Sequence, residues 1–191
     1  MSRPIRTERD ISVYLSYLLR HHPEAASLDM DFHGWVAVDQ LLENLRDACP
    51  LTREHLERIV AEDEKGRYRF SEDGDRIKAC QGHSIPWVEP ELTYGPPPAV
   101  LYHGTTAEAW EAIRASGYIS KMERHAVHMQ PDVEKAWQSA RRWKKQGKTP
   151  VVLVIDAARM AADGVAFGMS DNGVWCTERV DVRYVCRVLT A

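Results

Sequence analysis

The amino-acid sequence predicts an α+β protein built from two units of comparable size. A segment with five prolines, residues 86–98, interrupts every periodic pattern and indicates a linker. Helical stripes followed by one hairpin precede this segment, and short apolar strands mixed with helices follow it. We therefore expect a first domain over residues 1–90, a proline-rich linker over 91–98 and a second domain over 99–191.

The first unit begins with an amphipathic helix that ends before Pro23. Thr7 and Asp10 stand at the spacing of a capping box. The apolar residues recur every three or four positions and form one stripe: Ile11, Tyr14, Leu15, Leu18 and Leu19. The helix therefore ends on Arg20, His21 and His22. Cations at this position can stabilise the helix dipole, or they can bind an anion.

Two further helices and a hairpin are predicted in the first unit. Helical stripes cover residues 38–45 and a segment that starts near Thr52. Residues 68–70 and 77–79 then flank a turn and indicate two paired strands. Helices followed by a two-stranded wing suggest a small winged-helix module. Alternation along the first strand puts Arg67 and Arg69 on one face, either as exposed arginines or as ligand-binding ones.

The second unit is predicted to mix strands and helices in an α+β sheet domain. We expect strands over residues 100–102, 151–155, 165–167, 173–177 and 182–189, and helices over 107–115 and 133–145. Residues 121–150 hold eight Lys or Arg against three acidic residues, a local balance of +5. Such a stretch is either a solvated face or part of an anion site.

Composition narrows the class of protein. The chain has 191 residues, 44% of them hydrophobic, and a net charge of −3, which argues against a broad nucleic-acid-binding surface. Its four cysteines lack zinc-ligand spacing and suit a reducing compartment. No run approaches the roughly 20 apolar residues of a membrane span, and the first ten residues lack the apolar segment of a secretion signal. We therefore expect a cytoplasmic protein without a membrane segment.

Three polar segments stand out against the apolar elements. Residues 81–84, Gln-Gly-His-Ser, end the predicted hairpin and are either a simple turn or a ligand contact. Residues 103–106, His-Gly-Thr-Thr, follow a predicted strand, a common position for ligand contacts. Residues 170–173 contain Asn-Gly, a strong turn signal. The sequence has neither the GxGxxG motif of a dinucleotide-binding unit nor a phosphate loop for ATP.

Taken in order, these segments resemble the NAD-dependent RNA 2′-phosphotransferases, which remove the splice-junction 2′-phosphate from tRNA. The resemblance runs from Leu15 to Tyr184. Its matching segments are residues 15–24, 34–36, 69–70, 77–84, 101–105, 155–156 and 172–175. It implies an N-terminal winged-helix lobe, a C-terminal ADP-ribosyltransferase-like lobe and an active site in the cleft between them.

The resemblance also implies a basic tetrad that holds the phosphate. Arg20 and His21 match its Arg-His pair, and Arg69 matches the arginine before phenylalanine. We assign the fourth position to Arg142, with Arg141 as the alternative, because the stretch before Pro150 is longer here than is usual in the family. These four residues are the predicted catalytic residues.

Two further segments match the NAD-binding residues that the resemblance implies. His103, Gly104 and Thr105 would bind NAD around its nicotinamide ribose, and the 81–84 segment would line the same cleft through Gln81, Gly82, His83 and Ser84. No metal is required. The chain departs from the family pattern at Lys78, where arginine is common, and at Ala126, which replaces the first histidine of a His-x-His segment.

The implied reaction has two steps and consumes NAD as a co-substrate. The 2′-phosphate of the RNA attacks the NAD ribose and releases nicotinamide; the neighbouring ribose hydroxyl then frees 2′-OH RNA and ADP-ribose 1″,2″-cyclic phosphate. We expect a monomer whose partners are NAD and RNA carrying a 2′-phosphate. Two other hypotheses stay open: an ADP-ribosyltransferase that caps terminal phosphates of nucleic acid or modifies protein, and a non-catalytic winged-helix binder of nucleic acid.

Overall fold

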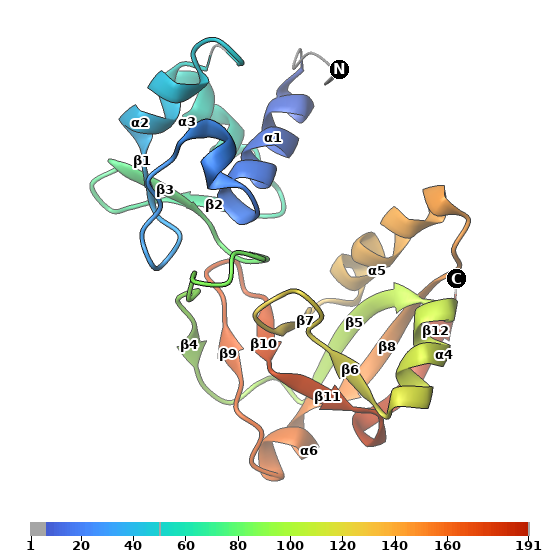
Figure 1. Ribbon diagram of the computed structural model, residues 1–191. Helices are drawn as coiled ribbons and strands as arrows, with labels where there is room; N and C mark the ends of the chain where they lie inside the picture. The colour runs from blue at the N-terminus through green and yellow to red at the C-terminus, as the bar shows by residue number, and fades with distance from the viewer. Residues whose placement is uncertain (1–6, 50, 191) are drawn as a thin grey trace. The chain divides into compact units, whose positions relative to one another are not determined.

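The computed structural model describes residues 7–49 and 51–190, and the chain divides into two compact units, residues 1–91 and 92–191 (Figure 1). Helices and antiparallel sheets occur together, which confirms the α+β prediction. Residues 1–6, which belong to the segment tested for a secretion signal, lie outside the described residues. Within the described part, no helix combines the length and the apolar character that crossing a membrane requires.

The described part of the first unit contains short helices and a three-stranded sheet. Its elements are α1 (Glu8–Arg20), η1 (Pro23–Ala26), β1 (Val36–Ala37), α2 (Val38–Leu45), α3 (Arg53–Ala61), β2 (Tyr68–Phe70) and β3 (Arg76–Ala79). The strand order is β1-β3-β2, so the predicted hairpin supplies two strands and β1 adds a third. A strand of two residues is too short to produce a period in the sequence, so the sequence did not predict it.

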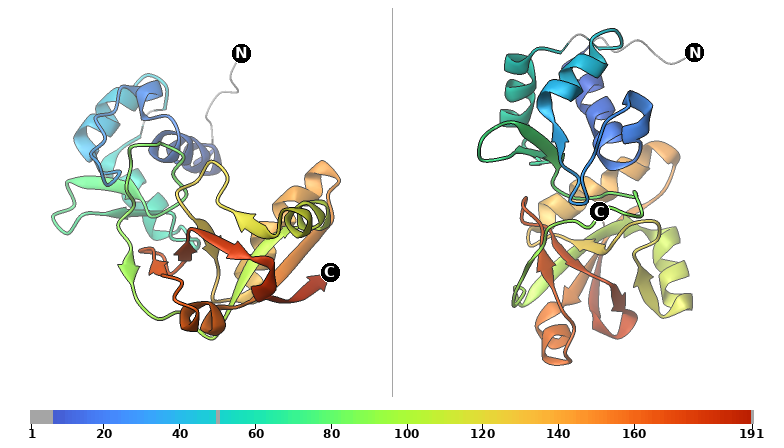
Figure 2. Two further views of the ribbon diagram at one scale, coloured as in Figure 1. Left: turned by 60° about the horizontal axis from the view of Figure 1, so that its bottom comes forward. Right: turned by 60° about the vertical axis from the view of Figure 1, so that its left-hand side comes forward.

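The core of the first unit joins the helical stripes to one face of this sheet. α1 begins with the predicted capping box, in which the backbone N–H of Asp10 donates to Thr7 Oγ1 at 3.1 Å and that of Thr7 donates to Asp10 Oδ2 at 3.1 Å. Leu15 and Leu18 of α1 are fully buried together with Ile77 of β3. Figures 1 and 2 show the helices on one side of the strands. The other face of the sheet therefore remains for polar residues.

Parts of the proline-rich segment over residues 86–98 are fixed by burial and hydrogen bonds. Val88 is fully buried, and the N–H of Glu89 donates to the carbonyl oxygen of Phe32 at 2.8 Å, so this part of the proline-rich segment is fastened to the first unit. The strand β4 (Thr93–Tyr94) pairs with β9 (Gly168–Met169) of the second unit's sheet. Prolines break periodic patterns, but the residues between them still carry the N–H groups that make these bonds.

The described part of the second unit contains three antiparallel sheets. Their strand orders are β12-β8-β5, β4-β9-β10-β7 and β11-β6. The remaining elements of the unit are β5 (Val100–Thr106), α4 (Ala107–Ser116), β6 (Tyr118–Ser120), β7 (Val127–Met129), α5 (Val133–Arg141), η2 (Arg142–Gln146), β8 (Pro150–Asp156), α6 (Ala157–Ala162), β9 (Gly168–Met169), β10 (Trp175–Thr177), β11 (Arg179–Asp181), η3 (Val182–Tyr184) and β12 (Val185–Thr190).

The strand β8 lies in the middle of the β12-β8-β5 sheet, and side chains cover both of its faces. Leu153 and Ile155 lie in the main core of the unit, whereas Val152 on the opposite face packs against Ala136 and Trp137 of α5. Side chains alternate along a strand, so an uninterrupted apolar run such as the one predicted over 151–155 fits a strand buried on both sides. Figure 1 shows α5 running along β5 and β8.

Several predicted elements of the second unit differ from the structure. Residues 165–167 do not form a strand; the strand β9 follows them at Gly168, and Phe167 is buried. The strand predicted over 182–189 begins with the 3₁₀ turn η3 and becomes β12 only at Val185. The helix predicted over 133–145 is α-helical only to Arg141, beyond which the chain tightens into the 3₁₀ helix η2. Apolar content predicted these segments, but for β9 and β12 the pairing with neighbouring strands set the bounds.

Candidate functional site

In the first unit, the end of α1 lies against the polar segment 81–84. Arg20 is the last residue of α1, and its carbonyl oxygen accepts a hydrogen bond from the N–H of Ser84 at 2.9 Å. His21 caps the helix, and its Nδ1 lies 2.8 Å from Ser84 Oγ. A β-carbon on Gly82 would lie 3.7 Å from Arg20 Nη1. The structure thus brings together four of the predicted site residues: Arg20, His21, Gly82 and Ser84.

Glycine is required in this segment for a conformational reason. Gly82 has φ +86°, a conformation that side chains other than glycine rarely adopt. The turn that it makes carries the backbone past the guanidinium group of Arg20. From the sequence, residues 81–84 are either a simple turn or a ligand contact; the structure shows a turn whose Gly82 lies beside a predicted phosphate-binding arginine.

His83 and Gln81 are the two other residues of this segment that are predicted to contact NAD. His83 is only 1% exposed, and its Nε2 lies 3.0 Å from the position that a β-carbon would take at Gly34. It therefore packs inside the first unit. Gln81 is partly exposed, but its Oε1 is buried and accepts no hydrogen bond from any residue that the structure describes.

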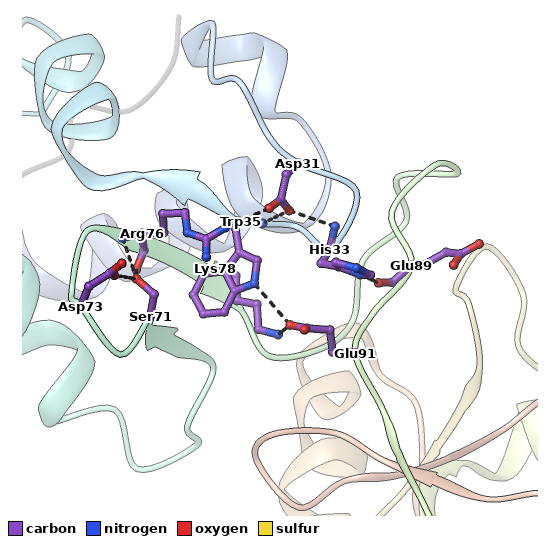
Figure 3. A network of polar contacts seen from close by, with 9 residues as sticks. All are labelled: Asp31, His33, Trp35, Ser71, Asp73, Arg76, Lys78, Glu89 and Glu91. Carbon is purple, nitrogen blue, oxygen red and sulfur yellow. Dashed lines mark hydrogen bonds and ion pairs between the residues drawn. The ribbon is translucent and has the colours of Figure 1, made fainter.

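Arg69, the third predicted catalytic residue, lies on β2 over the ring of Trp35. Its Cζ atom is 5.0 Å from the ring centroid. Trp35 also donates from Nε1 to Glu91 Oε2 at 3.3 Å, and Lys78 Nζ lies 2.6 Å from the same oxygen (Figure 3). Lys78, a predicted departure from the family pattern, is thus buried and paired with Glu91 inside the first unit.

Arg67 does not share this environment, although strand alternation predicted that it projects beside Arg69. β2 begins only at Tyr68, and the guanidinium group of Arg67 bonds to Asp63 Oδ1 from Nε at 2.9 Å and from Nη2 at 2.6 Å. Asp63 is four residues away and its side chain is almost fully buried. Arg67 therefore forms a local ion pair with Asp63. Strand periodicity does not apply to Arg67, because it lies before the first residue of β2.

In the second unit, His103, Gly104 and Thr105 lie inside β5 and not after it. They pair with Leu153, Val152 and Val151 of β8. The predicted strand was too short because a polar triplet interrupts the apolar pattern, while β8 is long enough to pair with it. Gly104 has a packing role, since a β-carbon there would lie 2.1 Å from the carbonyl oxygen of Ala136 in α5.

The ring of His103 is held in one tautomer. Its Nδ1 lies 3.0 Å from the carbonyl oxygen of His128. A carbonyl can only accept, so Nδ1 carries the hydrogen and the neutral ring presents Nε2 as an acceptor. Burial lowers the pKa of His103 below 6.5, and the nearby positive charges of Arg124 and Arg142 lower it further, while the bond to His128 opposes this shift. The neutral ring is therefore favoured at neutral pH.

Electrostatics distinguish the two candidates for the fourth tetrad position. Arg142 lies close enough to His103 and Arg124 to interact with both; burial and the charge of Arg124 lower the pKa of Arg142. Arg141, the last residue of α5, instead has Nη1 3.8 Å from Glu134 Oε2 and lies over the ring of Trp137. Arg142 therefore shares the electrostatic environment of the predicted NAD-binding histidine, whereas Arg141 lies beside Glu134 and Trp137.

Sequence reasoning did not single out Arg124 as a site residue. It belonged to the basic stretch over 121–150, whose charges also fit a solvated face. Arg124 directly precedes His125 and Ala126, and β7 begins at Val127. A single charged residue within a basic stretch has no distinguishing local pattern. Arg124 is identified only by its charge, which lowers the pKa of His103.

The second unit also contains a cleft of about 750 Å³. Its walls come from β4, the segment between β6 and β7, and the strands β10 and β11; among its lining residues are Tyr94, Lys121, His125, Cys176 and Arg179. None of the predicted catalytic or NAD-binding residues lines it. Burial raises the pKa of the Cys176 thiol to about 12, so this cysteine stays protonated at neutral pH and is a poor nucleophile.

Metal ligands do not gather in the part of the chain that the structure describes. Over residues 7–49 and 51–190, no group of three or more His, Cys, Asp or Glu side chains is arranged to hold an ion. The predicted site residues include arginines, histidines and hydroxyl groups. Such groups bind phosphate and donate or accept protons.

Comparison with known proteins identifies relatives along nearly the full chain. Residues 6–179 match the model of the family described as RNA 2′-phosphotransferase, Tpt1/KptA family. A probable RNA 2′-phosphotransferase of Rhizobium leguminosarum bv. trifolii is 43% identical over 180 residues, which cover 94% of each chain. One of Streptomyces coelicolor is 46% identical over 177 residues, or 92% of each chain. Among solved structures, protein CC0527 of Caulobacter crescentus has a TM-score of 0.36 and 18% identity, and covers 48% of this chain and 84% of its own.

Proposed function

The chain belongs to the RNA 2′-phosphotransferase family, Tpt1/KptA, and on that premise we propose that NAD accepts the 2′-phosphate of its RNA substrate. The protein is thus an RNA 2′-phosphotransferase, and the identity of its co-substrate is the step that we add. The observation that carries this proposal is the fixed tautomer of His103, with Arg124 and Arg142 nearby. The acceptor Nε2 suits a ribose hydroxyl, and the arginines suit the phosphates of a dinucleotide.

In the proposed first step, an oxygen of the RNA 2′-phosphate attacks the anomeric carbon of the nicotinamide ribose. The carbon–nitrogen bond breaks, and nicotinamide leaves with the electron pair. Arg20 and Arg69 orient the dianionic phosphate, because guanidinium groups bind phosphate through paired hydrogen bonds. Arg142 is the proposed fourth member of this set. His103 accepts a hydrogen bond from the ribose and fixes its orientation.

In the proposed second step, the 2″-hydroxyl of the ribose attacks phosphorus. The phosphorus–oxygen bond to the RNA breaks, the RNA oxygen takes up a proton, and ADP-ribose 1″,2″-cyclic phosphate is released. His21 is the proposed residue for proton transfer at a phosphate or leaving oxygen. Its contact with Ser84 Oγ at 2.8 Å orients the ring, and imidazole exchanges protons near neutral pH.

We propose corresponding roles for the two units. The first, with three helices packed on the β1-β3-β2 sheet, is a winged-helix lobe that supplies the phosphate-binding residues Arg20, His21 and Arg69. The second, with α5 packed on the β12-β8-β5 sheet, is an ADP-ribosyltransferase-like lobe that binds NAD. The tRNA splice junction is the substrate type that we propose for the RNA, and the cytoplasm is the proposed location.

The direct test uses a short RNA with one internal 2′-phosphate, incubated with the protein in the presence and absence of NAD. We expect loss of the 2′-phosphate only with NAD, together with equimolar nicotinamide and ADP-ribose 1″,2″-cyclic phosphate. The same RNA without the 2′-phosphate is the control and should release no nicotinamide. Dephosphorylation that proceeds equally without NAD would overturn the proposal.

The products also decide between the alternatives predicted from the sequence. RNA that keeps its phosphate and gains ADP-ribose would identify an ADP-ribosyltransferase that stops after the first step. Binding of RNA without release of nicotinamide would identify a non-catalytic binder. Arg20→Ala and His21→Ala variants should lose turnover under the proposed mechanism, whereas a non-catalytic binder would lose only affinity.

A further inference from the structure

The indole ring of Trp35 is surrounded by three cations. Lys78 Nζ lies 4.7 Å from the ring centroid, Arg69 Cζ 5.0 Å and Arg76 Cζ 5.3 Å. A cation within about 6 Å of an aromatic ring is attracted by the negative charge on its faces. Trp35 is only 7% exposed, so its ring is held in place by the protein. Figure 3 shows it beside Arg76 and Lys78, with Glu91 at its ring nitrogen.

Strand register explains why these residues meet. β3 pairs Lys78 with Arg69 of β2 and Ile77 with Val36 of β1. Trp35 comes directly before Val36, so continuing the register places it opposite Lys78, in one row with Arg69. Residues directly opposite each other share a face of the sheet, and like charges in this position repel. The row Trp35, Lys78 and Arg69 therefore needs a feature that offsets the repulsion between its two cations.

Two acidic residues offset part of this charge. Glu91 Oε2 lies 2.6 Å from Lys78 Nζ, and Asp31 Oδ2 lies 3.3 Å from Arg76 Nη1. The hydrogen bond from Lys78 is the main cause that lowers the pKa of Glu91, so this carboxylate stays ionised near neutral pH. The same Glu91 oxygen accepts from Trp35 Nε1, which ties the indole ring to the ion pair.

We propose that Trp35 is a positioning residue for Arg69, whose guanidinium group it holds over the indole face for binding of the RNA 2′-phosphate. Glu91 supports this arrangement because it fixes the ring and neutralises Lys78. The inference rests on the proposed function, in which Arg69 binds that phosphate. An arginine already confined to one region loses less conformational freedom on binding, so the confinement strengthens the interaction.

The test measures how strongly the full-length protein discriminates for the 2′-phosphate. The measured quantity is the ratio of Kd values for two short RNAs of identical sequence, one with and one without an internal 2′-phosphate, in the absence of NAD. Arg69→Ala should lower this ratio because it removes the guanidinium group. Trp35→Leu should lower it by roughly two- to fivefold, the range expected for a lost cation–aromatic contact.

A double-mutant cycle separates positioning from a general loss of structure. If Trp35 acts through Arg69, the Trp35→Leu substitution should have almost no effect on the ratio in the Arg69→Ala background. Trp35→Phe, which keeps an aromatic face but loses the bond to Glu91, should retain most of the discrimination. Trp87→Leu removes an exposed tryptophan of the same unit and should leave the ratio unchanged. Thermal unfolding of each variant identifies any that fails to fold.

Each outcome has one meaning. Equal effects of Trp35→Leu with and without Arg69 would overturn the inference, as would an unchanged ratio in folded Trp35→Leu when Arg69→Ala lowers it. Both results would leave the proposed function intact. A wild-type protein that does not distinguish the two RNAs would instead contradict phosphate binding itself. If Trp35→Leu does not fold, Trp35→Met, which also removes the aromatic face, provides the same cycle against Arg69→Ala.

Discussion

A β-carbon on Gly104 would lie 2.1 Å from the carbonyl oxygen of Ala136, so α5 reaches β5 only because Gly104 has no side chain. The sequence predicts a ligand contact at residues 103–106, but the space beside Gly104 is filled by the backbone of a helix. Since α5 leads directly to Arg142, the close approach at Gly104 also controls where this arginine lies relative to His103 of the same strand.

Gly104→Ala should therefore destabilise the protein. The added methyl group must displace a helix backbone, and forced overpacking of this kind costs about 3 kcal/mol. Urea denaturation would measure the loss of unfolding free energy. Gly95→Ala is the matched control, because nothing lies within 4 Å of a β-carbon there, and it should change the free energy by less than about 0.5 kcal/mol. Equal stability of the two variants would contradict the packing role.

Ser84→Ala should weaken catalysis without unfolding the protein. It removes the hydroxyl group 2.8 Å from His21 Nδ1, a contact that orients the ring. A lost hydrogen bond of about 1 kcal/mol corresponds to roughly a fivefold fall in kcat/KM for RNA phosphate transfer. Ser84→Thr keeps the hydroxyl group and should recover most of the activity. If threonine and alanine have the same effect, the hydroxyl group does not act through His21.

Arg142→Ala should raise the pKa of His103, because it removes a positive charge that disfavours the protonated ring. NMR titration of the His103 ring would measure the change. Arg141→Ala is the control: this neighbouring arginine is paired with Glu134 and should leave the His103 pKa as it is. The two variants should also differ in the activity of phosphate transfer, and Arg142→Ala should lose more of it than Arg141→Ala. A larger effect at Arg141 on both measurements would reverse the tetrad assignment.

His103 should also make the unfolding free energy depend on pH. Its pKa in the folded protein lies below the ordinary 6.5, so the unfolded chain takes up the proton first as pH falls. The folded state should be fully favoured above about pH 6.5 and lose stability as the pH drops from there toward the folded pKa. Denaturation from pH 8 to pH 5.5, compared with His103→Gln, isolates this contribution. A wild type that gains stability relative to this variant on acidification would contradict the sign.

Local elements of the first unit could be predicted well from the sequence. The stripe of α1, its capping pair Thr7 and Asp10, and the hairpin of β2 and β3 all depend on neighbouring residues. Periodicity and turn chemistry act within a few positions, so they leave a readable pattern. The family, too, could be recognised from the order and spacing of short motifs, and the match over residues 6–179 confirms it.

Contacts between distant residues could not be predicted in the same way. β1 and the full length of β5 exist because β3 and β8 supply partners for them, and the pairing of Arg67 with Asp63 overrides strand alternation. Apolar pattern alone placed a strand at 165–167, where the structure has none. Hydrogen bonds to partners far along the chain determine such boundaries, and one segment's pattern contains no information about its partner.

The sequence by itself determined the α+β class, the helix that ends on Arg20 and His21, and the family, because each depends on local pattern or on ordered motifs. Only the tertiary structure decided what surrounds the candidate residues: Ser84 and Gly82 beside that helix end, Trp35 under Arg69, and Arg124 and Arg142 near His103. The physical reason is that charge, tautomer and packing depend on distances in space, and residues far apart in the chain set those distances.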